Sequence, residues 1–281
     1  MNALAQKFFT DQLFETEKGK AIGLEYFVER EFKPETIRKF QLGYSPEEWD
    51  TFTKYALDQG YKKEYLEKTG LTIVREEKMY DRFRARVIFP IHNITGRVLG
   101  FGGRTLSREP NIPKYVNSPE SDIYNKSQVL YGLFFAKNAI IRSDVCYLVE
   151  GYTDVISLHQ AGIENVVASS GTSLTAEQVK LIKRYTQNIT ILYDGDPAGI
   201  KASFRGIDMV LEEGMNVRIV LFPDNEDPDS YARKYRRQEL EDLITGGAKD
   251  FIRFKTGLLL KEAAGDPIKR AALIKEIVGS I

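Results

Sequence analysis

The chain has 281 residues, with 40 lysines and arginines against 40 aspartates and glutamates, two histidines and one cysteine. This length predicts two or three packed subdomains. Apolar runs are far shorter than the roughly 20 residues that cross a bilayer, and the amino terminus lacks a basic-then-apolar signal pattern, so we expect a cytoplasmic protein without a membrane partner. The lone Cys146 and two scattered histidines exclude an intramolecular disulfide and a Cys/His zinc cluster, so a bound metal would have oxygen ligands.

Charge is unevenly distributed along the chain. Residues 75–126 hold ten basic against six acidic side chains, a net of +4, whereas residues 144–230 hold six against fourteen, a net of −8. This asymmetry suits a protein that handles an anionic polymer on one surface and concentrates cations at another, although solvated surfaces alone can produce the same pattern.

The first half of the chain changes texture twice. The first seventy residues have apolar positions at helical spacing and a helix start at Pro34, so we expect a small helical region. Short β-type runs joined by the turn-like residues 93–96 then predict a hairpin between Leu71 and Leu106. Residues 107–127 lack periodicity and are rich in Pro, Asn, Ser and Lys, which predicts a long surface loop.

Strands and helices alternate regularly from Cys146 onward. The pattern predicts a parallel sheet covered on both faces. The expected strands are 146–149, 165–168, 189–193 and 217–222, and the expected helices begin near Tyr152, Thr175, Pro197 and Asp229.

Acidic residues follow three of these strands. Ligands of an open parallel sheet bind beyond the carboxyl ends of its strands, so adjacent strand ends would crowd the acids together. Such crowding is costly unless divalent cations lie between the carboxylates, and oxygen ligands suit Mg²⁺. The six acids are Glu150, Asp154, Asp194, Asp196, Asp227 and Asp229.

Each acidic segment alone also has an ordinary structural interpretation. Asp194-Gly195-Asp196 could form a turn, Asp227-Pro228-Asp229 could begin a helix, and the pair Glu150 and Asp154 could bias a helix amino terminus. Their joint placement at successive strand ends favours a site. Gly151 and Gly195 would leave room for a ligand near the backbone. A Walker A loop is absent, which excludes an ordinary P-loop ATPase.

These segments resemble a known family. Glu150-Gly151-Tyr152-Thr153-Asp154, Asp194 to Gly199 and Asp227-Pro228-Asp229 are similar to the three acidic motifs of a Toprim domain, which primases, topoisomerases and related nucleases share. Four more stretches resemble the bacterial DnaG-type replicative primase: Arg82 to Ile91, Gly100-Phe101-Gly102-Gly103-Arg104, Pro113 to Glu120 and Leu130-Tyr131-Gly132-Leu133.

The resemblance implies a catalytic core that reads single-stranded DNA and joins ribonucleotides into a short RNA primer with Mg²⁺ or Mn²⁺, two or more ions, and no zinc in this chain. It implies that Glu150, Asp194 and Asp196 are catalytic and that all six acids surround the metals. It also implies that several residues of the basic part contact nucleotide phosphates or template. These residues are Arg30, Arg82, Arg104, Lys114, Asn117 and Lys126.

Two departures from the family are visible. The zinc ribbon and the helicase-binding domain of such primases are missing from this sequence, so coupling to a replicative helicase would need a domain absent here. The usual Arg-Gly at the end of an early helix is Arg30-Glu31 in this chain.

Arg82, Arg84 and Arg86 alternate along the chain, so they could belong to a basic track or lie on the solvent face of a strand. The resemblance also implies that nucleotides of the guanosine tetraphosphate type act as inhibitors.

The expected fold class is α/β. It comprises a mixed α/β subdomain with the basic track at 1–143, a Toprim-type parallel sheet at 144–224 and a helical segment with the last acidic motif at 225–281. The expected function is primer synthesis, with single-stranded DNA, ribonucleoside triphosphates and RNA primer as partners, in the bacterial cytoplasm at replication forks. A Toprim nuclease or topoisomerase and a non-catalytic DNA-binding module remain alternatives.

Overall fold

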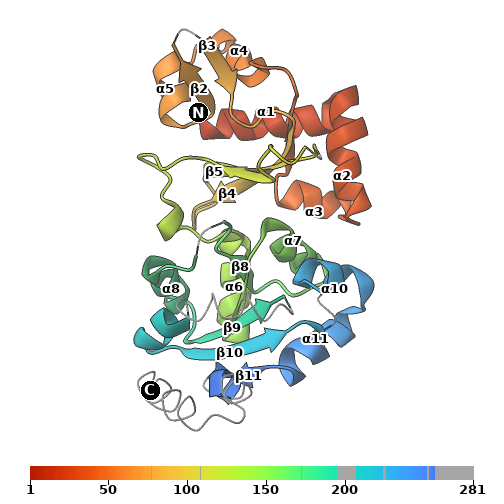
Figure 1. Ribbon diagram of the computed structural model, residues 1–281, viewed down its shortest axis with the longest axis vertical. Coiled ribbons are helices and arrows are strands. Elements are labelled where there is room, and N and C mark those ends of the chain that lie inside the picture. Colours follow the sequence, from red (N-terminus) through yellow and green to blue (C-terminus); the bar gives the residue numbers. More distant parts are fainter. Residues whose placement is uncertain are drawn as a thin grey trace. The chain divides into compact units, whose positions relative to one another are not determined.

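The structure, a computed structural model, describes residues 1–76, 78–107, 109–171, 173–194, 207–223, 226–251 and 253–256. The chain forms two compact units, Met1–Phe135 and Ala136–Ile281, which are treated separately (Figure 1). The division into three parts at residues 143 and 224 stays a prediction. The helix expected near Pro197 and the acid Asp196 lie outside the described residues.

The first seventy residues are mainly helical, as predicted. Pro34 begins a helix, because its fixed φ suits the first helical position. No sequence pattern predicted the short strand β1 (Gly43–Ser45), which lies between α3 and α4. The helical elements are α1 (Asn2–Glu15), the π-helix η1 (Gly19–Leu24), α2 (Glu25–Glu29), α3 (Pro34–Lys39), α4 (Thr51–Asp58) and α5 (Lys63–Lys68).

The first unit contains a four-stranded antiparallel sheet in the order β1-β4-β5-β6. The predicted hairpin joins β4 (Arg86–His92) to β5 (Val98–Thr105). Its turn is closed by the Asn93 side chain, which accepts hydrogen bonds from the backbone N–H groups of Thr95 and Arg97, and Gly96 supplies a φ of +87°. The expected loop at 107–127 is partly wrong, because it contains β6 (Tyr115–Asn117) on the sheet edge.

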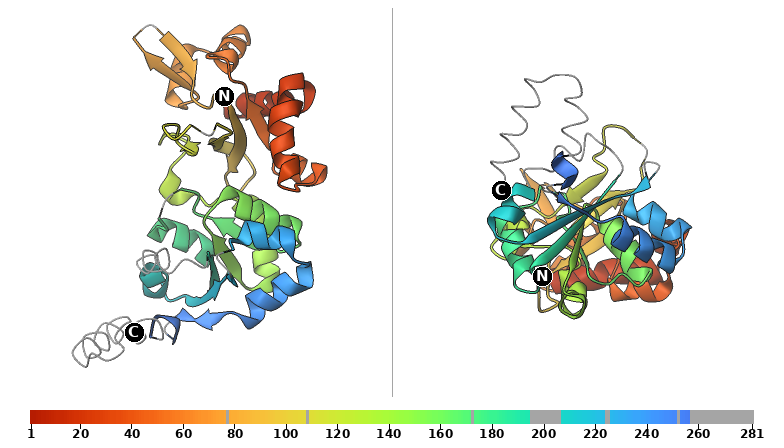
Figure 2. Two further views of the ribbon diagram at one scale, coloured as in Figure 1. Left: turned by 45° about the vertical axis from the view of Figure 1, so that its right-hand side comes forward. Right: turned by 90° about the horizontal axis from the view of Figure 1, so that it is seen from below.

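Aromatic side chains fill the interior of the first unit. Phe8 and Phe9 of α1 pack against Phe52, and Phe9 also meets Phe101 of β5 at a ring-centroid distance of 5.4 Å. A separate hairpin of β2 (Thr72–Arg75) and β3 (Lys78–Asp81), seen beside α4 in Figure 2, is fixed by a buried carboxylate. Asp81 accepts hydrogen bonds from the first backbone N–H groups of α4 and thereby caps that helix.

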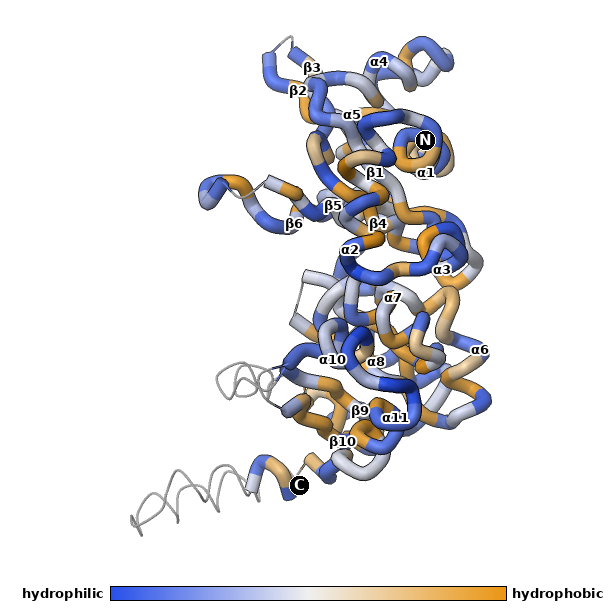
Figure 3. Tube along the Cα trace, turned by 90° about the vertical axis from the view of Figure 1, so that its right-hand side faces the viewer, coloured by the Kyte–Doolittle hydropathy of each residue, from blue (hydrophilic) through white to orange (hydrophobic). Residues whose placement is uncertain are grey.

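The second unit has the predicted parallel sheet. Its strands are β7 (Cys146–Val149), β8 (Val166–Ala168), β9 (Asn188–Tyr193) and β10 (Asn216–Leu221), each within one residue of the prediction. The spatial order is β11-β10-β9-β7-β8, with only the short β11 (Lys249–Asp250) antiparallel. β9 and β10 are strongly apolar, as buried parallel strands should be (Figure 3).

The described helices of the second unit also follow the sequence signals. Thr175 caps α8 in a reciprocal arrangement with Gln178, and Gly214 has a φ of +72° in the turn before β10. No helix in the described parts of the chain is long and apolar enough to span a membrane. The helices are α6 (Leu133–Ser143), α7 (Tyr152–Gln160), α8 (Ala176–Lys183), α10 (Pro228–Lys234) and α11 (Arg237–Gly246).

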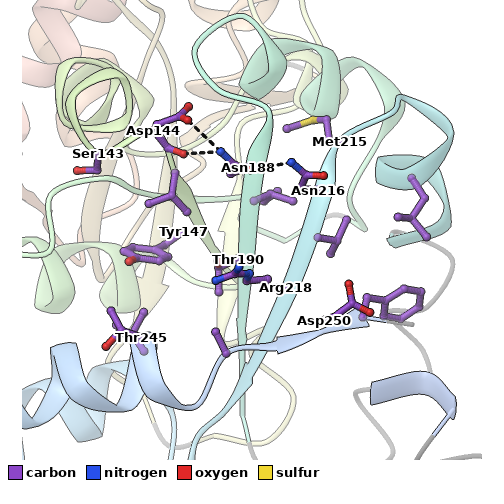
Figure 4. A pocket seen from close by; sticks show the side chains of 17 residues that line it. Ser143, Asp144, Tyr147, Asn188, Thr190, Met215, Asn216, Arg218, Thr245 and Asp250 are labelled. Carbon is purple, nitrogen blue, oxygen red and sulfur yellow. Dashed lines mark hydrogen bonds between the residues drawn. The ribbon is translucent and has the colours of Figure 1, made fainter. Parts of the chain in front are cut away.

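A pocket of about 670 Å³ lies against this sheet (Figure 4). Tyr147, Thr190 and Arg218 form a row across three strands and line it. Asn188 and Asn216, which begin β9 and β10, also line it and share a hydrogen bond of 2.9 Å. The pocket therefore reaches the amino ends of the strands, opposite to the ends that carry the acids.

Candidate acidic and basic sites

Two exposed acids lie at the carboxyl ends of neighbouring strands. Glu150 follows β7 directly and Asp194 follows β9 directly. β7 and β9 are parallel partners, with Leu148 paired to Ile191. Parallel neighbours end at the same edge of a sheet, so both carboxylates extend from that edge.

Asp154 shows the electrostatic character of this edge. It lies in the first turn of α7, where its Oδ2 accepts a hydrogen bond from the backbone N–H of Gly151 at 2.9 Å. Burial, together with the negative charges of Asp227, Asp229 and Asp194, raises the pKa of Asp154 to about 7. Residues from three separate acidic segments are thus close enough to repel one another, as the sequence predicted.

Asp227 and Asp229 are held by α10. Asp227 caps this helix, since its Oδ1 accepts a hydrogen bond from the backbone N–H of Ser230. Asp229 is only 3% exposed, accepts a hydrogen bond from the hydroxyl of Ser157 and lies 3.6 Å from Nε of Arg233. Asp229 therefore joins α7 to α10, two helices that pack together, and a direct metal contact by it stays a prediction.

The chemistry of these donors fits a divalent cation. They are hard oxygen ligands, and a bound cation would offset the repulsion that raises the pKa of Asp154. Within the ranges that the structure describes, no group of three or more acidic, histidine or cysteine side chains has the geometry of a metal site. Asp196, which the sequence assigns to the metals, lies outside those ranges.

The predicted basic residues Arg30 and Arg104 are brought together in the first unit. Arg30 follows α2 and Arg104 belongs to β5, yet both guanidinium groups lie near the ring of Tyr26. The Cζ atoms are 5.2 Å and 4.7 Å from the ring centroid, respectively, which is cation–π distance. The Nε atom of Arg104 is buried and has no hydrogen-bond acceptor among the described residues.

Lys114 and Asn117 lie beside Arg104 on the sheet edge. β6 pairs with β5 so that Asn117 is opposite Gly102 and Tyr115 is opposite Arg104. The Lys114 side chain is exposed, whereas its carbonyl accepts a hydrogen bond from Thr105 at 3.0 Å. The backbone is therefore anchored while the ammonium group faces solvent.

Lys126 lies in the short helix η2 (Lys126–Gln128) farther along this segment. Its backbone N–H donates to the Glu120 carboxylate at 3.1 Å, which closes a small loop. Within that loop Tyr124 is buried, and its ring would be 3.2 Å from a Cβ placed on Gly100 of β5. This packing ties the Lys126 loop to the sheet that carries Arg104.

The three alternating arginines do not occupy the solvent face of a strand. Residues 82–85 form a turn with Ala85 at a φ of +53°, and β4 begins only at Arg86. Arg82 donates from Nε to the Gly70 carbonyl at 2.5 Å. Arg86 is buried and donates to the carbonyls of Gly103, Pro113 and Lys114, so it fixes the start of the Lys114 segment.

Three side chains at these sites were missed from the sequence. Tyr26 was detectable because it precedes Arg30 by one helical turn. Trp49, the only tryptophan, is 64% exposed and lies under the Arg84 guanidinium at 3.5 Å, but no periodic pattern marks it. Ser157 reads as an ordinary helix residue, because its partner Asp229 is far away in the sequence.

Profiles of known families match both units. The profile for the DNA primase catalytic core, N-terminal domain, matches residues 8–137, and a Toprim-like profile matches residues 147–232. The chain is 43% identical over 253 residues to the DNA primase of Halalkalibacterium halodurans, and 44% identical over 245 residues to that of Clostridium acetobutylicum. These matches cover 89% and 87% of this chain but 42% and 40% of the relatives, so the chain spans less than half of their length.

Solved structures show the same relationship. A DNA primase domain from Pseudomonas aeruginosa is similar with a TM-score of 0.89 and 34% identity, over 99% of this chain and 89% of that one. The RNA polymerase domain of Mycobacterium tuberculosis primase DnaG has a TM-score of 0.88 and 31% identity. The match covers 100% of this chain and 92% of that one. A DnaG primase catalytic domain bound to single-stranded DNA has a TM-score of 0.85 and 34% identity, over 99% and 90%. The chain therefore belongs to the family of bacterial DnaG-type DNA primases and corresponds to their catalytic core with its Toprim domain.

Proposed function

We propose that this chain is the part of a primase that joins ribonucleotides into short RNA primers on single-stranded DNA. The observation that carries the proposal is the group of repelling carboxylates at the strand ends of the Toprim-like unit, where the pKa of Asp154 rises to about 7. Primer extension is attack of a 3′-hydroxyl on the α-phosphate of a nucleoside triphosphate with pyrophosphate leaving. Such a reaction needs cations held by acids.

Asp194 and Asp196 would hold Mg²⁺ or Mn²⁺, with Glu150 beside them as a metal ligand or proton-transfer group. When bound, divalent ions lower the pKa of the attacking hydroxyl and neutralise charge on the leaving oxygens. Asp154, Asp227 and Asp229 would complete the acidic crevice. Their hydrogen bonds to Gly151, Ser230 and Ser157 fix the three carboxyl groups in place.

The basic residues of the first unit would bind the phosphates of template and nucleotide. The exposed ammonium group of Lys114 supports this role, as does the guanidinium group of Arg104, whose Nε has no acceptor in the described part of the chain. Contacts of this kind give salt-sensitive, sequence-tolerant binding. The proposed set is Arg30, Arg82, Arg104, Lys114, Asn117 and Lys126.

The cellular setting follows from the family. We propose that the whole protein acts in the cytoplasm at replication forks, where a domain outside this chain couples it to the replicative helicase. Guanosine tetraphosphate-type nucleotides are proposed as inhibitors, since their phosphates would compete for the same cations and basic groups.

One assay separates the proposed activity from its alternatives. The chain is incubated with single-stranded DNA, labelled ribonucleotides and Mg²⁺ or Mn²⁺, with a chelator as the control. RNA that depends on template and metal supports the proposal. Cleaved DNA would instead show a Toprim nuclease, and neither product would show a binding module.

A further inference from the structure

Tyr26 links two basic residues that come from distant parts of the sequence. Its side chain is 8% exposed, and the guanidinium groups of Arg30 and Arg104 both approach its ring. The negative face of an aromatic ring attracts a cation without cancelling its charge. Tyr26 therefore orients both guanidinium groups, as a carboxylate would, but without offsetting their positive charge.

The position of Tyr26 is itself fixed. The neighbouring Phe27 is fully buried and meets Phe89 of β4 with a centroid distance of 6.0 Å, so α2 is anchored to the sheet. The preceding π-helix packs closely, since a Cβ on Gly23 would lie 2.8 Å from the Tyr44 side chain. After this π-helix, Phe27 lies in the core and Tyr26 contacts Arg104 of β5.

The arginine opposite Tyr26 is incompletely satisfied. Nε of Arg104 is buried without an acceptor in the described part of the chain, and the described ion pairs give its guanidinium no carboxylate. A buried donor without a partner is costly, so the fold holds this guanidinium in place at a cost that a function would explain. Phosphate oxygens are the ligands that a guanidinium fork binds best.

We propose that Tyr26 is a positioning residue that holds Arg30 and Arg104 together for one phosphate-bearing ligand. This inference rests on the proposed phosphate-binding role of the two arginines. It adds that their orientation depends on the π face of Tyr26 and not on its hydroxyl or its bulk. The phosphate belongs either to an incoming ribonucleotide or to the template backbone.

The test compares changes that separate the ring face from the volume of the side chain. Tyr26→Phe keeps the face and nearly all the volume, and Tyr26→Leu replaces the ring with a smaller apolar side chain. A Tyr26→Phe variant with a fluorinated ring keeps the volume but weakens the ring face. Binding of single-stranded DNA is measured without divalent metal at several salt concentrations, and KM and kcat for ribonucleotides are measured in primer synthesis. Thermal unfolding of each variant checks the fold.

Tyr26→Phe should keep the DNA affinity and the ribonucleotide KM within about twofold of wild type. Tyr26→Leu should weaken DNA binding or raise the KM for ribonucleotides by about fivefold to thirtyfold, the range expected for a partly desolvated cation–π contact. A rise in KM with little change in kcat would assign the phosphate to the nucleotide, whereas weaker binding of DNA would assign it to the template. In an Arg30→Ala/Arg104→Ala background, Tyr26→Leu should have no further effect.

Two results would overturn the inference. One is equal impairment of Tyr26→Phe and Tyr26→Leu, and the other is an undiminished effect of Tyr26→Leu in the background without the arginines. If Tyr26→Leu unfolds, a Tyr26→Phe variant with a fluorinated ring keeps the shape but weakens the ring face, and it should still bind less tightly. If Arg104→Ala weakens binding while every Tyr26 variant binds normally, only the role of Tyr26 fails. If Arg30→Ala/Arg104→Ala has both the DNA affinity and the ribonucleotide KM of wild type, the phosphate-binding proposal fails as well.

Discussion

The two units hold opposite charges by the same kind of physical means. In the first unit, arginines are held by aromatic rings and backbone carbonyls, as Arg104 is by Tyr26 and Arg86 by Pro113. In the second unit, carboxylates are held by backbone N–H groups and a hydroxyl, as Asp154 is by Gly151. Asp229, which also meets Arg233, is the exception.

This comparison explains how charged side chains can be fixed and still remain available. A salt bridge would orient an arginine or a carboxylate but would also cancel the field that a ligand needs. Neutral partners orient the group and leave its charge, at the cost of mutual repulsion within each cluster. That cost is visible in the pKa of Asp154, which burial and neighbouring acids raise to about 7.

The largest effect is expected in the second unit. Asp194→Asn keeps the volume of an exposed strand-end side chain but removes the charge that a hard cation requires, so primer synthesis should fall by about a hundredfold or more. The variant should fold normally, because it relieves repulsion in the metal-free protein. The measurement is RNA yield with Mg²⁺, and Asp242→Asn on the exposed face of α11 is the matched control. Full activity of Asp194→Asn would remove this residue from the site.

The next effect tests the neutral partner of an acid. Ser157→Ala removes the hydroxyl that donates to the buried Asp229, so unfolding free energy should fall by about 1–3 kcal/mol. Urea unfolding measures this loss. Thr245→Ala, which removes only an exposed contact to a helix carbonyl, should change stability by about 0.5 kcal/mol or less. Equal stability of wild type and Ser157→Ala would mean that Arg233 alone holds Asp229.

Burial also determines whether a basic group of the first unit is charged, as His92 shows. Its ring is buried against Phe134 and Phe135 and bonds Gln41, and burial lowers its pKa to about 4. In the unfolded chain the imidazole of His92 binds a proton near pH 6.5. The stability that the neutral His92 contributes is therefore fully present above that pH and is lost as pH falls toward about 4. Between pH 7 and 5.5 this loss should be about 1 kcal/mol. Urea midpoints of wild type and His92→Gln should converge as pH falls, and a constant difference would contradict this account.

The smallest effect is expected from a single surface cation. Lys114→Ala should weaken binding of single-stranded DNA only a few-fold and reduce the salt slope by up to about one charge, with stability nearly unchanged. Binding isotherms at four or more salt concentrations measure this slope. Lys68→Ala, an exposed lysine paired with Glu64 in the same unit, is the control. Identical slopes for Lys114→Ala and wild type would exclude Lys114 from the phosphate contacts.

Local sequence signals predicted the fold well where they are periodic. The strands of the second unit were placed within one residue, because a parallel sheet buries continuous apolar runs such as 188–193. Short edge strands such as β6 were missed, because three residues carry no usable period. Glu150 and Asp194 follow strands directly, as the sequence indicates, and burial together with acids of the other segments raises the pKa of Asp154. The roles of the acids at a metal stay a prediction.

Contacts between distant segments were beyond the sequence. Nothing near Arg104 indicates that a helix 78 residues earlier supplies the ring that it meets. The alternation of Arg82, Arg84 and Arg86 suggested a strand, but a positive φ at Ala85 makes a turn instead. Such features depend on tertiary packing, which single-sequence patterns do not encode.

The division of labour between the two units can be measured most directly by a paired experiment on Asp194→Asn and Arg104→Ala. Thermal unfolding with and without Mn²⁺ reports cation binding, and DNA affinity without divalent metal reports phosphate binding. Mn²⁺ at a hundred times its dissociation constant should raise the unfolding free energy of wild type and of Arg104→Ala by about 2–3 kcal/mol. The same concentration should stabilise Asp194→Asn much less. DNA affinity should fall for Arg104→Ala and hold or rise for Asp194→Asn. Two results would contradict this assignment of cations to the second unit and phosphates to the first. One is that Mn²⁺ stabilises Asp194→Asn as much as wild type, and the other is that Mn²⁺ no longer stabilises Arg104→Ala.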